Sequence, residues 1–87
     1  MSVYLITYDL NHETKRPPIV EEVHSYGLWA KLSESSYAIK TYDSVEAIYD
    51  RFNKHLDGND QLYVIGLKAP WSGFGPKRVN EWLNENL

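Results

Sequence analysis

The sequence contains no cysteine among its 87 residues. Disulfide bonds, zinc sites with thiolate ligands and cysteine nucleophiles are therefore excluded. The chain also lacks the run of about 20 apolar residues that a helix needs to cross a bilayer, and no basic start leads into an apolar signal segment. We therefore expect a soluble, cytoplasmic protein with no membrane partner, since the absence of cysteine is compatible with a reducing compartment.

Positive charge is also scarce, because nine Lys and Arg residues stand against twelve Asp and Glu residues and leave a net charge of −3. The molecule as a whole does not attract a phosphate polymer, so any binding of RNA or DNA would need a local basic patch or a metal ion. The length is enough for one domain over residues 1–87, but it is close to the size at which a single core becomes marginal. We therefore expect a homodimer.

Extended segments occur in three places along the chain. Residues 2–9 alternate apolar side chains between two faces and are rich in β-branched and aromatic residues, which predicts a central strand. Residues 28–41 contain two extended runs with a weak break at residues 33–35, which favours a hairpin. Residues 61–68 also alternate and follow the turn-forming Asp60. Together these segments predict four strands.

Helical spacing of apolar residues occurs between the strands and at the end of the chain. The first helix is predicted from Pro17 to Tyr26, because its two initial prolines are tolerated in a first turn and Gly27 can cap its end. The second helix runs from a cap at Asp43 or Ser44 to a stop at Gly58, with one apolar stripe. Residues 77–87 form a third amphipathic segment after a stretch rich in Gly and Pro.

The resulting order is βαββαβ, followed by an extension. A split unit of this kind forms one antiparallel sheet with both helices on one face and with the first and third strands in the middle. We therefore predict an α+β domain with its core in residues 2–68 and a C-terminal extension, residues 69–87, that ends in a short helix. The second face of the sheet needs a cover.

The first strand ends on a carboxylate, Asp9. In the predicted topology Asp9 lies near Ser35 or Ser36 on one side and Asp60 on the other. Such a group could hold a hard cation such as Mg²⁺ or Mn²⁺, which stabilises charge on a phosphodiester. We therefore treat Asp9 as the candidate catalytic residue and Asp9 with Asp60 as candidate metal ligands. The alternative is structural, because Asp at strand ends and in turns often accepts from the following backbone N–H groups.

Cationic and aromatic residues can likewise be interpreted as functional or as structural. Lys15, Arg16 and Lys40 are candidates for contacts to RNA or DNA, although charged residues of this kind usually serve solubility. Most aromatic residues, Tyr63 among them, fall at periodic apolar positions typical of a core.

The extension carries three aromatic residues of its own. Trp71 and Phe74 lie in its irregular Gly- and Pro-rich part, where they could pack over the open sheet face or anchor a partner subunit. Trp82 lies on the apolar side of the closing helix. These three residues are therefore the candidate interface.

The order of the segments resembles that of a known family. "YLITYDL", a helix, "SESSYAIK", a second helix and "DQLYVIGL" are similar to the pattern of the small second CRISPR-associated protein, the dimeric subunit of the spacer-integration complex. That family has "YD" at the end of its first strand and an apolar fourth strand that begins with Asp. Standalone phage and bacterial proteins and the virulence-associated protein D group share this form. The resemblance covers residues 3–68 and implies a ferredoxin-like fold with dimerisation through the sheet.

The resemblance also implies a metal-dependent nuclease in which Asp9 of each subunit faces its symmetry mate. The chain departs from the family pattern after Asp9, where a long basic helix is absent, and before the third strand, where "LSESS" replaces a motif with Gln. The extension, residues 69–87, also differs from the family's strand-like tail.

Two functions from different classes remain open. The first is a metal-dependent endonuclease acting on RNA, in which Asp9 binds Mg²⁺ or Mn²⁺. Lys15, Arg16 or Lys40 would steady the phosphate. The second is a non-catalytic dimeric module that binds a protein or nucleic-acid partner, for instance in conflicts between phage and host. The acidic net charge and the sparse ligand set favour the second function, whereas the "YD" context of Asp9 favours the first.

Overall fold

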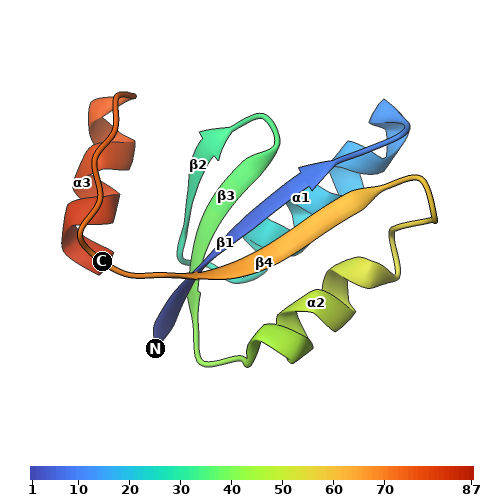
Figure 1. Ribbon diagram of the computed structural model, residues 1–87, viewed down its shortest axis with the longest axis horizontal. Helices are drawn as coiled ribbons and strands as arrows, with labels where there is room; N and C mark the ends of the chain where they lie inside the picture. Colours follow the sequence, from blue (N-terminus) through green and yellow to red (C-terminus); the bar gives the residue numbers. More distant parts are fainter.

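The computed structural model describes all residues 1–87 and contains one antiparallel sheet of four strands (Figure 1). The elements are, in chain order, β1 (Ser2–Asp9), a 3₁₀ turn (Glu13–Lys15), α1 (Arg16–His24), β2 (Trp29–Ser33), β3 (Ser36–Thr41), α2 (Val45–Asn53), β4 (Gln61–Leu67) and α3 (Lys77–Asn86). The strand order is β2-β3-β1-β4, so β1 and β3 are central. The predicted βαββαβ order, the α+β ferredoxin-like class and the terminal helix are confirmed.

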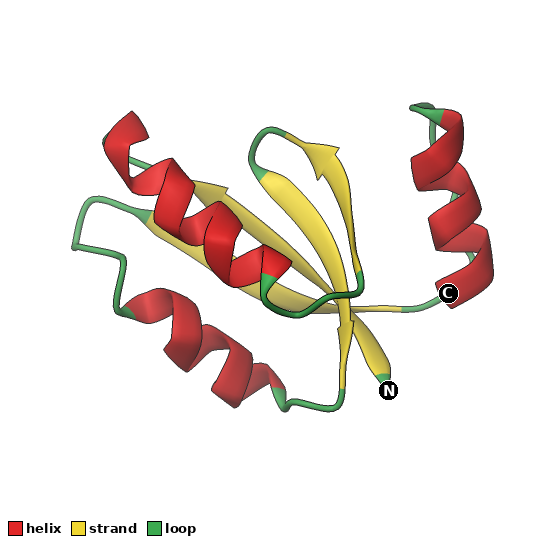
Figure 2. Cartoon of the chain, turned by 180° about the vertical axis from the view of Figure 1, so that it is seen from behind, coloured by secondary structure: helices red, strands yellow, loops and turns green.

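One face of the sheet carries the main core. Seen from behind in Figure 2, α1 and α2 lie across the sheet and α3 stands apart from them. Alternate residues of the strands face α1 and α2, because side chains in a strand point to opposite faces in turn. The buried cluster between sheet and helices contains Ile6, Tyr8, Ile19, Val23, Tyr37, Ile39, Ile48, Phe52 and Leu62.

The opposite face is covered only in part, on the β2 side. Ala30, Ala38 and Val3 point away from α1 and α2 and are nevertheless buried, as is Leu83 of α3. The main contacts of α3 are with β2, where the small alanine side chains leave room for a helix. The extension therefore covers part of this face through α3, but the region around Tyr63 and Ile65 of β4 stays open. None of the helices is long and apolar enough to cross a membrane.

Local chemistry sets the helix ends. The Ser44 side chain accepts a hydrogen bond from the Ala47 N–H at 3.1 Å, so Ser44 and not Asp43 caps α2. The first helix is shorter than predicted, because α1 ends at His24 and its C-cap is Ser25, so Gly27 does not cap it directly. Gly27 has φ +81° and belongs to the turn that follows, where the left-handed conformation suits glycine.

The Ser44 cap gives a direct test of the fold. Replacing Ser44 with Ala should lower the free energy of unfolding by about 1 kcal/mol, because the Ala47 N–H loses its partner in the first turn. Urea denaturation measures this change. Ser72→Ala is the matched control, since Ser72 is exposed and makes no side-chain hydrogen bond, and it should leave the unfolding midpoint unchanged. Equal midpoints for both variants would contradict the assigned cap.

Candidate functional site

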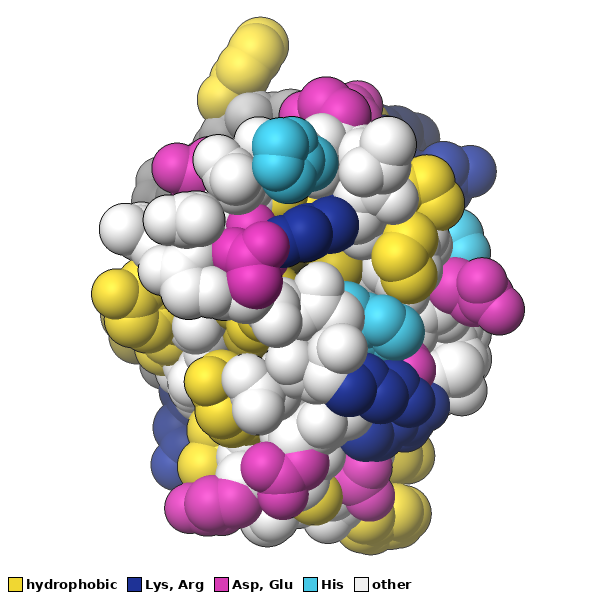
Figure 3. Space-filling model, turned by 90° about the vertical axis from the view of Figure 1, so that its right-hand side faces the viewer, with side chains coloured by type: hydrophobic (Ala, Val, Ile, Leu, Met, Phe, Trp, Pro, Cys, Tyr) yellow, Lys and Arg dark blue, Asp and Glu magenta, His cyan; other side chains and the backbone are white.

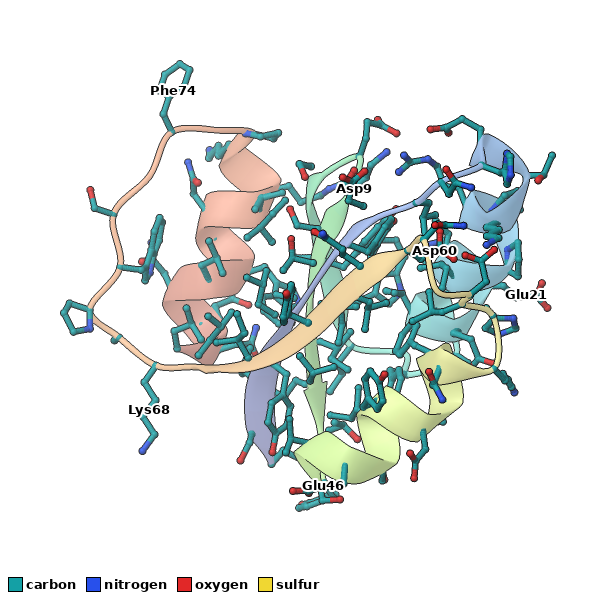
Figure 4. The ribbon with its side chains drawn as sticks, turned by 45° about the vertical axis from the view of Figure 1, so that its right-hand side comes forward. Asp9, Glu21, Glu46, Asp60, Lys68 and Phe74 are labelled. Atoms are coloured by element: carbon teal, nitrogen blue, oxygen red, sulfur yellow. The ribbon has the colours of Figure 1, made fainter.

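Three loops meet at the end of the sheet where β1 stops and β4 begins. Asp9 is paired with Gln61 in the β1–β4 ladder, and Gln61 directly follows Asp60. On the other side of β1, the Tyr8 N–H donates to the Ser35 carbonyl at 2.9 Å. Figure 4 shows Asp9 and Asp60 at this same end of the sheet. The backbone therefore brings Asp9, Ser35 and Asp60 to one region, as the topology predicts.

The Asp60 carboxylate is turned inward and its side chain is completely buried, with 0% exposure. One oxygen accepts from the Asn11 N–H at 2.7 Å. The other accepts from the Asp57 N–H at 2.9 Å and from Lys15 Nζ at 2.6 Å. The Asn11 N–H and the Lys15 ammonium, followed by the Asp57 N–H, lower the pKa of Asp60 to about 2. Asp60 therefore joins the β1–α1 loop to the α2–β4 turn, and its oxygens have partners within the chain.

Lys15 is engaged by the same cluster. Its ammonium donates to both Asp57 and Asp60, and these hydrogen bonds raise the pKa of Lys15. The Asp57 backbone N–H in turn donates to Asp60, so the three residues form one closed group. Lys15 therefore serves as the counter-ion of a buried carboxylate.

The other two candidate cations also have internal partners. Arg16 donates to both oxygens of Glu13, at 2.9 and 3.2 Å, and to the Glu34 carbonyl. Its guanidinium lies 5.7 Å from the centre of the Tyr8 ring, and Glu13 raises the pKa of Arg16. Lys40 Nζ donates to Asn86 Oδ1 at 3.1 Å and so attaches α3 to β3.

Charge is therefore balanced locally at this end of the molecule. Figure 3, which faces the side where β1 ends and β4 begins, shows basic, acidic and histidine side chains interleaved rather than gathered by sign. Such a surface offers no extended basic patch to a phosphate polymer.

Asp9 differs from the other carboxylates here. Its side chain is exposed and accepts no hydrogen bond or ion pair within the chain. By strand alternation Asp9 shares the open face with Thr7 and Leu5. No group of three or more His, Asp or Glu side chains is placed to hold a metal ion. Within one chain, Asp9 is therefore an exposed carboxylate without a hydrogen-bond partner.

The three aromatic residues of the extension fall into two groups. Trp71 and Trp82 are half-buried. Trp71 lines an apolar pocket with Leu67 and Val79, and so holds the extension against the sheet. Phe74 is fully exposed and points away from the body of the molecule in Figure 4. Only Phe74 has the exposure expected of an anchor for a partner.

The structure adds two residues that the sequence analysis did not assign to a site. Tyr63 is 61% exposed and Ile65 is 49% exposed, both on the open face of β4. The expectation that Tyr63 belongs to the core is wrong, because α3 covers only the β2 side of this face. The sequence feature that could have indicated an exposed apolar surface is the absence of any charged residue from Gln61 to Leu67. The same pattern, however, is typical of a strand buried on both faces.

No protein-family model matches this sequence, and no match was found among curated proteins. Function is therefore inferred from the ferredoxin-like fold and the side-chain geometry.

The buried Asp60 predicts a specific dependence of stability on pH. Its pKa is about 2 in the folded chain and 3.8 as the ordinary value, so its contribution is complete above about pH 4 and disappears as the pH falls towards 2. Asp60→Asn should therefore lower the midpoint of urea unfolding above pH 4. The difference from the native protein should vanish near pH 2.

Asp50→Asn is the matched control, since Asp50 is exposed on α2 and has no ion pair. It should show little change at either pH. A difference for Asp60→Asn that is constant from pH 6 to pH 2 would contradict the assigned role of the ionised carboxylate.

Proposed function

We propose that this protein is a homodimeric binding module that associates through the open half of its sheet. The observation that carries the proposal is the exposure of Tyr63 and Ile65 on a strand without charged residues. Thr7 is paired with Tyr63, and Leu5 is paired with Ile65, so the four residues form one continuous surface. We call this surface the β1–β4 strip.

The position of β4 supports this proposal. It is an edge strand, and edge strands of monomeric proteins are usually protected by Lys, Pro or a bulge. The sequence from Gln61 to Leu67 contains neither charge nor proline, and it pairs with β1 in an uninterrupted register. An uncovered strand of this kind favours association with another surface.

A second copy of the chain is the partner that this strip fits best. A two-fold axis places the same surface on both sides of an interface, and an uncharged strip can face itself without repulsion. Complete burial of an apolar side chain such as Ile65 contributes about 1.5–3 kcal/mol. Because a single core is marginal in a chain of this small size, the additional burial at a dimer interface would also stabilise the fold.

The pairing of Lys15, Arg16 and Lys40 within the chain favours a binding module over a phosphate-processing enzyme. A residue that neutralises a buried carboxylate or holds a helix is not free to contact a substrate. The exposed Phe74 supplies a separate apolar anchor, and the dimer would present it twice to a further partner.

A metal-dependent endoribonuclease is the second candidate, because Asp9 lies exposed on the face that holds the β1–β4 strip. One chain does not complete a metal site, so this function requires a second carboxylate, which a dimer could supply as Asp9 of the other subunit. The pair would hold Mg²⁺ or Mn²⁺. When bound, such an ion supplies stabilisation of negative charge on a phosphodiester.

The dimer is tested by adding charge to the strip. Ile65→Lys should weaken self-association by at least about tenfold, because each two-fold contact would bury two like charges. Analytical ultracentrifugation over micromolar concentrations measures the change. Tyr42→Lys is the control, since Tyr42 is 85% exposed and follows the last residue of β3, outside the β1–β4 strip. A monomeric native protein, or equal dissociation constants for a folded Ile65→Lys variant, would contradict the interface.

The second candidate is tested at Asp9. If the enzyme exists, the purified protein cleaves single-stranded RNA with Mn²⁺, and Asp9→Asn lowers the rate by at least about a hundredfold, since the ligand charge is lost. Asp50→Asn should retain the full rate. Cleavage that survives in Asp9→Asn would assign the activity to another source. Absence of cleavage in the native protein, together with an intact dimer, supports the binding module alone.

A further inference from the structure

A groove of about 400 Å³ lies between β2 and α3. Its lining includes Trp29, Ala30 and Lys31 from β2 and Arg78, Val79 and Trp82 from α3. β2 is the opposite edge of the sheet from β4, so the groove is separate from the β1–β4 strip. Nothing in the argument for a dimer depends on it.

Trp82 of α3 supplies the aromatic ring of the groove, whereas Trp29 borders the groove at the β2 edge and turns its ring towards α1. Trp29 is stacked on His24, with 4.2 Å between the ring centres, and meets Tyr37 edge to face at 6.0 Å. Trp82 is half-buried on α3. Neither indole N–H donates a hydrogen bond within the chain. Packing of α3 alone needs apolar surface and does not need an unpaired indole donor beside the groove.

The groove also carries positive charge. Arg78 is exposed and has neither an ion pair nor a side-chain hydrogen bond, unlike Lys15, Arg16 and Lys40. Lys31 donates to Glu34 at 2.9 Å, but its side chain remains 45% exposed. No acidic side chain lines the groove. A free guanidinium therefore stands next to aromatic surface in a chain that is acidic as a whole.

We propose that the β2–α3 groove binds a nucleotide, with the base against Trp82 and the phosphate on Arg78. Aromatic rings bind nucleobases by stacking, and the fork of an arginine matches the oxygens of a phosphate. The volume lies within the range of small-molecule sites, and one nucleotide has about the size to fill it. The nucleotide is either free or the end of a single strand, and both present the same base and phosphate.

Binding is tested with 5′-AMP and with a short single-stranded RNA as the two ligands. In a ¹H–¹⁵N spectrum the indole N–H signal of Trp82 should shift on addition of either ligand. The signal of Trp71 should stay in place, because Trp71 lines a different pocket. Binding of AMP identifies a free nucleotide site, whereas binding of RNA alone identifies the end of a strand.

Charge reversal separates the proposed contact from general electrostatics. Arg78→Glu should weaken binding of the ligand by at least about tenfold, while Lys77→Glu, the same change one residue earlier, should have less than a twofold effect. Adenosine, which has no phosphate, should bind equally to the native protein and to Arg78→Glu. Trp82→Leu keeps apolar volume in the groove and should weaken both AMP and adenosine.

Three results would overturn the proposal. The first is the absence of any indole shift with both ligands at millimolar concentration. The second is an equal loss for Arg78→Glu and Lys77→Glu, which would show nonspecific attraction of an anion. The third is unchanged affinity in Trp82→Leu, with folding of that variant verified by circular dichroism.

Discussion

The arrangement of this small domain depends on one buried carboxylate. Asp60 accepts two backbone N–H groups and the Lys15 ammonium, and so joins the loop after β1 to the turn before β4. Both loops lie at the same end of the sheet, where a chain of this size has little core to hold them. An ionised carboxylate in this position is stable only while its donors remain in place, so the cluster holds the two loops together.

The unequal covering of the two sheet faces follows from the order of elements. Both crossover helices pack on one face, and only the extension is left to cover the other. Its helix finds room where Ala30 and Ala38 are small, on the β2 side. The β1–β4 half therefore keeps Tyr63 and Ile65 exposed. The half-covered face, more than any single residue, supports the proposed dimeric binding module.

The polar groups of the candidate site differ in whether they already have partners within the chain. Lys15, Arg16 and Asp60 each have partners within the chain, whereas Asp9 and Arg78 have none. The free groups lie in different places, one by the open strip and the other in the groove beside α3. Such a division is compatible with self-association at one edge of the sheet and ligand binding at the other.

The order of elements, the central position of β1 and the cap at Ser44 or its neighbour were determined by the sequence alone, because periodicity and capping are local properties of consecutive residues. The region shared by Asp9 and Asp60 also followed from topology. Only the tertiary structure decided that Asp60 points inward, that Lys40 holds α3 and that Tyr63 is exposed. Side-chain partners such as Lys15 and Asp60, or Lys40 and Asn86, come from segments more than forty residues apart. An apolar strand also has the same sequence pattern whether its second face contacts a helix or water.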